Sequence, residues 1–101
     1  MRMLMKAMIP HEPFNAYVKD GSIEQKLSRV LAETKPEAVY FTNIRGQRCV
    51  ILIVDLPEPS KVPALAEPWF LLLKADVEFN IVMNPDDLKK AGLEAIGKKW
   101  A

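Results

Sequence analysis

The sequence predicts an α+β fold in which a ferredoxin-like βαββαβ order with an added C-terminal helix builds a four-stranded antiparallel sheet. The first observation is the run CVILIVD from Cys49 to Asp55, which is apolar on both alternating faces and therefore suits the middle of a sheet. The second is the alternation of apolar residues over 1–9 and 77–83, and the third is the helical spacing over 22–35 and 60–74.

The size and charge of the chain restrict its function. With 101 residues, half of them apolar, we expect one domain that spans residues 1–101. The formal net charge of +1 gives too weak a field to predict binding to nucleic acid or a membrane surface, so we expect neither partner. Cys49 is the only cysteine, which excludes an intrachain disulfide and a cysteine-based metal cluster and favours a cytoplasmic location. We also expect no cofactor, since no glycine lies in a phosphate-loop context.

The N-terminal part is expected to hold the first strand at Met1–Ile9 and a short helical turn at Phe14–Lys19. The first long helix begins at Ser22, because Ser22 and Gln25 have the spacing of a capping box. It ends before Pro36, since the residue that precedes a proline is disfavoured in helical geometry.

A β-hairpin is expected next. Glu37–Thr42 is rich in β-branched and aromatic residues and reads as the second strand, with Gly46 at the tip of the connection to the central strand. Because the connection is short, the second and third strands are expected to be neighbours.

The second long helix is expected to start at the capping residue Ser60 and to carry Pro63 in its first turn, where the missing N–H donor costs nothing. Its apolar pattern continues past Pro68, which should remove one backbone hydrogen bond and kink the helix. Val77–Met83 alternates again and is the expected fourth strand.

The last helix has a strong N-terminal signal. Asn84 can cap it, and Asp86 and Asp87 place carboxylates at the positive end of the helix dipole. This role explains the two aspartates better than metal binding does. The helix should run to about Lys99, with Gly92 as its weak point.

This order of elements predicts how the sheet is covered. Right-handed crossovers would place the first and third strands in the centre and both long helices on one face. The other face, roughly 400 Å² for four strands of about 20 Å, would stay bare in a single chain. A bare face of that size that includes side chains of the central strand is more than monomers usually expose, so we expect a homodimer through it.

Polar residues of the outer strands are the first candidates for a site. If the apolar sides of the first and fourth strands pack under the helices, then Lys6, Glu78 and Asn80 point to the bare face. Tyr40 would join them from the second strand, and Lys6 would lie across from Glu78 or Asn80. These groups form either a structural ion pair at a dimer interface or the polar part of a ligand cavity.

Three other residues have a structural and a functional interpretation. His11 is the only histidine; it is a possible base, although the sequence shows no partner for a triad or a metal site. Cys49 suits a small buried hydrophobe better than a nucleophile. Trp69 either anchors the second long helix on the sheet or lines the mouth of a pocket beside the kink at Pro68.

Several segments resemble a known group of proteins. KPEAVYF (35–41), PSKVPALAEPWF (59–70), VMNPDDLKKAG (82–92) and NAYVKDGS (15–22) are similar to small, mostly uncharacterised bacterial proteins of the dimeric α+β barrel superfamily. That superfamily includes muconolactone isomerase-like and antibiotic biosynthesis monooxygenase-like proteins. The resemblance implies a homodimer with facing sheets, and it implies no particular reaction.

Two classes of function are left open. In the first, the protein is a non-catalytic homodimer that binds a small hydrophobic molecule between its sheets or serves as an assembly module. In the second, it is a cofactor-independent isomerase or monooxygenase for a small aromatic or lactone-like substrate, with Tyr40, Lys6 and His11 handling protons. We favour the first, because no pair of titratable groups shows divided acid and base roles.

Overall fold

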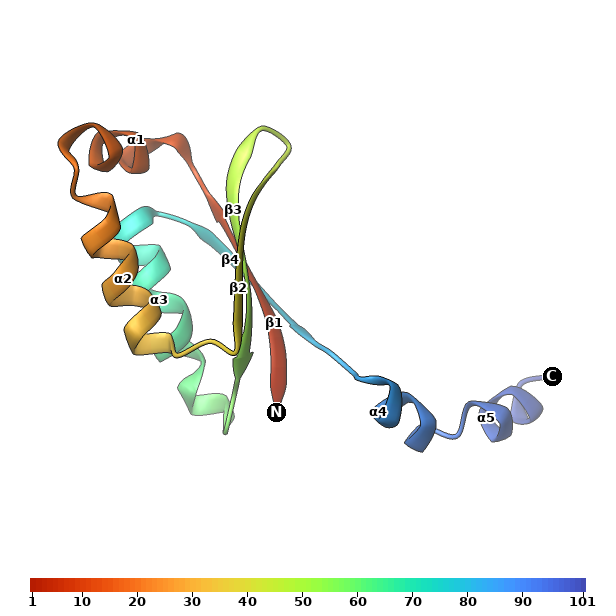
Figure 1. Ribbon diagram of the computed structural model, residues 1–101. Helices are drawn as coiled ribbons and strands as arrows, with labels where there is room; N and C mark the ends of the chain where they lie inside the picture. Colours follow the sequence, from red (N-terminus) through yellow and green to blue (C-terminus); the bar gives the residue numbers. More distant parts are fainter.

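Four antiparallel strands form one open sheet in the order β2-β3-β1-β4, seen almost edge-on in Figure 1. The computed structural model describes all residues, 1–101. The strands are β1 (Arg2–Ile9), β2 (Ala38–Ile44), β3 (Gln47–Asp55) and β4 (Asp76–Ile81). The predicted placement of the first and third strands in the centre is therefore confirmed, as is the α+β class with a ferredoxin-like arrangement.

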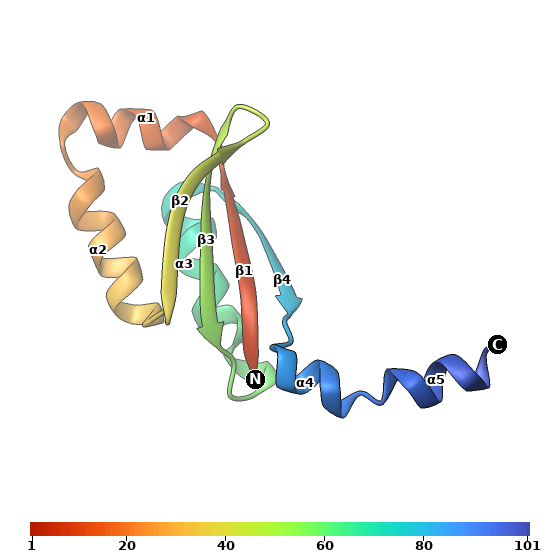
Figure 2. The same cartoon turned by 45° about the vertical axis from the view of Figure 1, so that its right-hand side comes forward.

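Three helices cover one face of the sheet, as the turned view of Figure 2 shows. They are α1 (His11–Asp20), α2 (Ile23–Thr34) and α3 (Val62–Leu73), and a short 3₁₀ turn, η1 (Pro59–Lys61), leads into α3. The predicted helical turn at Phe14–Lys19 lies within α1 and is confirmed; Glu12, near the start of α1, is not in helical geometry. Arg48 of β3 helps to hold α1, because its guanidinium lies 4.3 Å from the ring centroid of Phe14 and donates a 2.7 Å hydrogen bond to Asn15 Oδ1.

The hydrophobic core lies between this face and the helices. Its centre is the register pair Met5 and Leu52, both without solvent exposure, and Trp69 packs into the same core from α3. The β2–β3 hairpin turns at Arg45 and Gly46, both with positive φ, so the predicted position of Gly46 at the tip is confirmed. The chain continues as a helix through Pro68, as predicted.

Two predicted N-terminal caps are wrong in detail. Ser22 stands at the N-cap position of α2, but its hydroxyl accepts a 2.9 Å hydrogen bond from Lys26 Nζ instead of capping a backbone N–H. Ser60 lies inside η1, and its hydroxyl donates to Glu58 Oε1 at 2.7 Å. In both cases a charged side chain nearby competes with the backbone for the hydroxyl group.

The C-terminal segment forms two short helices instead of the single one predicted. These are α4 (Pro85–Lys90) and α5 (Leu93–Lys99), and they are separated at Gly92, whose φ of 71° is incompatible with a continuing helix. The predicted cap of α4 is confirmed as a full capping box between Asn84 and Asp87. The helices α4 and α5 extend away from the sheet, so the molecule measures 59 Å along its longest axis and 29 and 19 Å along the other two.

Candidate functional site

The candidate site is the face of the sheet that carries no helix, which we call the open face. Alternate residues of each strand point to it, and the strand registers align them in rows across β2, β3, β1 and β4. The three complete rows are Ala38–Ile53–Leu4–Asn80, Tyr40–Ile51–Lys6–Glu78 and Thr42–Cys49–Met8–Asp76.

The centre of the open face is apolar. Leu4 and Met8 of β1 and Ile51 and Ile53 of β3 are half-buried in the single chain, because only their neighbours on the sheet cover them. The outer strands contribute most of the polar groups. The open face therefore has an apolar centre and polar edges, as small-molecule sites and protein interfaces do.

Lys6 and Glu78 form the ion pair of the middle row. They are direct register partners on β1 and β4, and Lys6 Nζ lies 3.8 Å from Glu78 Oε2. The Lys6 side chain is 32% exposed and that of Glu78 is 65% exposed, so in the single chain water screens the pair. The predicted position of Lys6 across from Glu78 is confirmed.

Tyr40 and Asn80 lie on the same face at its two edges. Tyr40 is 65% exposed, and its phenol hydroxyl has no hydrogen-bond partner in the chain, so it is free to bind another molecule. Asn80 follows Glu78 by two residues along β4 and is also exposed. The structure thus places four of the predicted residues, Lys6, Tyr40, Glu78 and Asn80, on one surface.

Two other candidates lie elsewhere. Trp69 is completely buried on the helix-covered side of the sheet, where it anchors α3, and its indole N–H has no hydrogen-bond partner. His11 is exposed at the start of α1, after the last residue of β1, and forms no hydrogen bond or ion pair. The structure therefore does not bring Trp69 or His11 together with the Lys6 row.

Cys49 is buried in the third row, between Thr42 and Met8. Burial raises the pKa of its thiol; nearby Lys6 lowers the pKa less strongly, and Glu78 raises it further. The thiol therefore stays protonated at neutral pH, as expected of a small buried hydrophobe.

The apolar residues of the open face on β3 were not identified from the sequence. Ile51 and Ile53 belong to a run that is apolar at every position, so periodicity cannot tell which residues face the helices. The register with β1 supplies the missing signal, because Met3 and Met5, which are buried under the helices, pair with Val54 and Leu52.

No cavity exists on the open face of one chain. A groove of about 480 Å³ lies between α2 and α3, on the far side of the molecule, and a second hollow lies on the C-terminal helices. No cluster of three or more metal-ligating side chains is present, and no helix has the length and apolar character needed to cross a bilayer. A site at the Lys6 row would need a cover from outside the chain to exclude water.

Comparison of the chain with models of known protein families found no match, and neither did comparison with curated proteins.

Proposed function

We propose that two copies of the chain pair through their open faces and hold a small hydrophobic molecule between the two sheets. The observation that carries the proposal is the half-buried apolar centre around Ile51, which is crossed by the Tyr40–Lys6–Glu78 row. Pairing would remove this centre from water, which stabilises the dimer by about 25 cal/mol for each Å² of apolar surface buried. The resemblance of residues 35–41 and 59–70 to dimeric α+β barrel proteins supports the same pairing.

The polar row defines the chemistry of the bound molecule. Lys6 can donate hydrogen bonds from its ammonium group, and Tyr40 can donate or accept one, so a ligand with a single oxygen function would be oriented by both. The rest of its surface would contact Leu4, Ile51 and Ile53. We therefore propose an apolar ligand with one carbonyl, hydroxyl or acidic group, bound without a cofactor.

The pairing is tested by measuring the mass of the full chain in solution over the micromolar range. We expect two chains for the native protein and the 11.4 kDa single chain for Ile51→Asp, because an unpaired carboxylate between the sheets is costly. Val18→Asp, at an exposed position of α1, is the matched control and should stay a dimer. Circular dichroism confirms that each variant is folded. A native protein that is a single chain throughout, or an Ile51→Asp protein that is still a dimer, would contradict the proposal.

Binding is tested with the apolar anion 1-anilinonaphthalene-8-sulfonate, in parallel with native mass spectrometry of the purified dimer for a retained molecule. We expect saturable binding of the probe to the dimer. The double variant Lys6→Met/Glu78→Gln removes both charges together and should weaken binding roughly tenfold or more, since a hydrogen bond to a charged group contributes about 1.5–3 kcal/mol. A dimer that binds no probe, or binds it equally after this double substitution, would refute the internal site.

A cofactor-independent isomerase or monooxygenase is the second candidate, because Tyr40 and Lys6 lie in one row and could both reach a substrate. For any small aromatic or lactone-like substrate that the protein converts, Tyr40→Phe should lower turnover by a larger factor than it raises the dissociation constant of the substrate. Equal turnover by this variant would exclude Tyr40 from proton transfer.

A further inference from the structure

We infer that residues 82–101, which we call the C-terminal arm, dock on the second copy of the chain, so that each copy clasps the other. This inference rests on the proposed pairing of the open faces and goes beyond it, because pairing of the sheets does not by itself require the arm.

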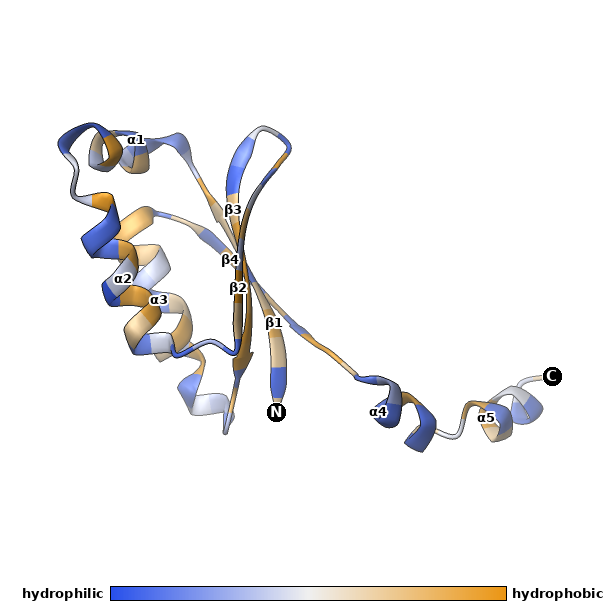
Figure 3. Cartoon of the chain, viewed as in Figure 1, coloured by the Kyte–Doolittle hydropathy of each residue, from blue (hydrophilic) through white to orange (hydrophobic).

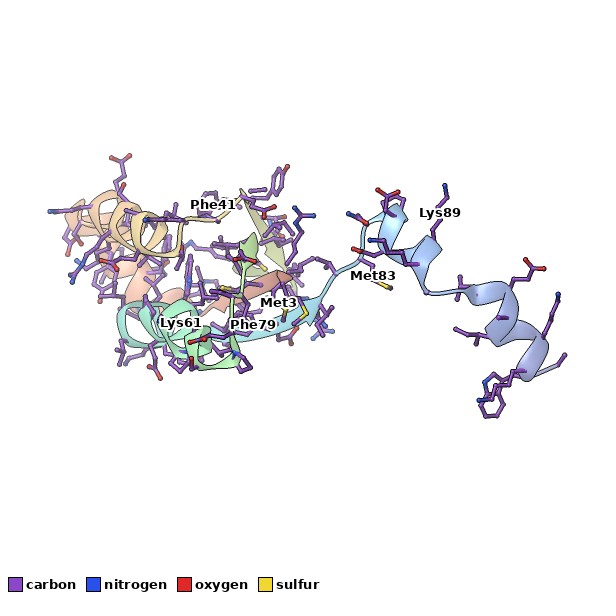
Figure 4. The ribbon with its side chains drawn as sticks, turned by 90° about the horizontal axis from the view of Figure 1, so that it is seen from below. Met3, Phe41, Lys61, Phe79, Met83 and Lys89 are labelled. Carbon is purple, nitrogen blue, oxygen red and sulfur yellow. The ribbon has the colours of Figure 1, made fainter.

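The arm is unprotected in the single chain. Every residue from Met83 to Ala101 is exposed, including Trp100 at 78%. Figure 4 shows Met83 and Lys89 set apart from the body of the molecule, where Met3 and Phe79 lie among other side chains. The large apolar side chains of the arm are Met83, Leu88, Leu93, Ile96 and Trp100. A segment with this many exposed large apolar residues is typical of a contact surface.

The apolar residues lie on one side of the arm helices. Leu93 and Ile96 lie three residues apart on one face of α5, and Trp100, the C-cap residue, follows Ile96 by four residues in the same stripe. Leu88 and Leu93 line the same shallow hollow, so the stripe continues from α4 to α5. Lysines and acidic residues occupy other positions, as the alternating blue and orange of the arm in Figure 3 shows. The arm therefore has one side suited to docking.

The helices of the arm are specified by sequence but too short to be stable alone. Asn84 Oδ1 accepts a hydrogen bond from the Asp87 N–H at 2.8 Å, and Asp87 Oδ2 accepts one from the Asn84 N–H at 3.1 Å. Yet α4 has six residues and α5 seven, whereas isolated helices shorter than about 12–15 residues are marginal in water. A helix that is capped but has no surface to pack on in its own chain implies a partner surface.

The direction of the arm identifies that partner as a second copy. The arm leaves the end of β4 toward the side of the sheet opposite α2 and α3, which is where the paired copy would lie (Figures 1 and 2). The open face alone offers roughly 400 Å² as a flat plane. A stable protein interface usually buries about 800 Å² on each partner. The apolar side of the arm would therefore enlarge the interface that the two sheets form.

The test follows Trp100 fluorescence and mass together in the full chain. The emission of Trp100 is obtained as the difference between the native protein and Trp100→Phe, which leaves the buried Trp69 in place. We expect this emission to move to shorter wavelength over the same concentration range in which the mass rises from one chain to two.

Leu93→Glu and Ile96→Glu should each raise the dissociation constant of the dimer roughly tenfold or more, as expected for loss of a buried aliphatic side chain. Lys89→Glu, at an exposed charged position of α4, is the matched control and should change it by less than about threefold.

Each other outcome overturns the inference in a recognisable way. If Trp100 keeps the emission of a water-exposed indole in the dimer, the sheets pair but the C-terminal arm does not dock on the second copy. A blue shift that does not depend on concentration means that the arm folds onto its own chain. A blue shift that needs phosphatidylserine vesicles assigns the arm to a lipid surface, and a mass of four chains assigns it to a neighbouring dimer. A single chain at every concentration refutes the clasp and the proposed function together.

Discussion

The ion pair between Lys6 and Glu78 reports whether the open face is enclosed. We consider a double-mutant cycle of Lys6→Met, Glu78→Gln and the double variant, which measures the coupling free energy of the two side chains. Their charged atoms are 3.8 Å apart. Coulomb's law gives about 1 kcal/mol for this separation in water and about 4 kcal/mol at an effective dielectric constant of 20.

The environment of the pair decides which value applies. In a single chain both side chains contact water, and exposed ion pairs are typically worth about 0.2–1 kcal/mol. Between two facing sheets, removal of one partner leaves the other charge without compensation, and such losses are typically about 3–5 kcal/mol. We therefore expect a coupling free energy above about 2 kcal/mol in the dimer.

The assay is urea-induced unfolding of the four proteins, followed by circular dichroism at one protein concentration at which the native protein is a dimer. A fixed concentration is needed because the unfolding of a dimer depends on it. Salt provides a control, since an enclosed pair is screened much less than an exposed one. If the coupling stays below about 1 kcal/mol in a protein of dimer mass, Lys6 and Glu78 are not enclosed, and the proposed position of the ligand between the sheets is wrong.

Two further predictions concern the core and the thiol. Leu52→Ala empties a fully buried position and should lower the free energy of unfolding by about 2–5 kcal/mol, whereas Leu71→Ala, at an exposed position, should change it by less than about 0.5 kcal/mol; equal effects in thermal unfolding would contradict the assigned core. Because burial raises the pKa of Cys49, the protonated thiol stabilises the fold below the unfolded thiol pKa of about 8.5, and this contribution is lost as the pH rises through the folded value. The free energy of unfolding should therefore fall more steeply above about pH 8.5 in the native protein than in Cys49→Ala, and parallel pH profiles would refute this effect.

The fold class and most of the element order could be predicted from the amino-acid sequence. Alternation in β1 and β4 marks residues such as Met5 and Phe79 as core, and it sends Lys6 and Glu78 to the other face. Strand periodicity has a period of two, so it fixes the face of a side chain as soon as the strand is identified. This is why the middle polar row, including Tyr40, could be predicted before the structure was known.

Two features could not be predicted from the sequence: which residues of β3 face the helices, and where the C-terminal segment lies relative to the sheet. Every residue from Val50 to Val54 is apolar, so the register with β1 was needed to assign Ile51 to the open face and Leu52 to the core. The role of Trp69 is likewise ambiguous in the sequence, because a residue that anchors a helix on the sheet and a residue that lines a pocket have the same helical spacing. The C-terminal arm is the clearest case. Its helix signals are local, whereas its separation from the body follows from the lack of contacts with the rest of the chain, which no local signal encodes.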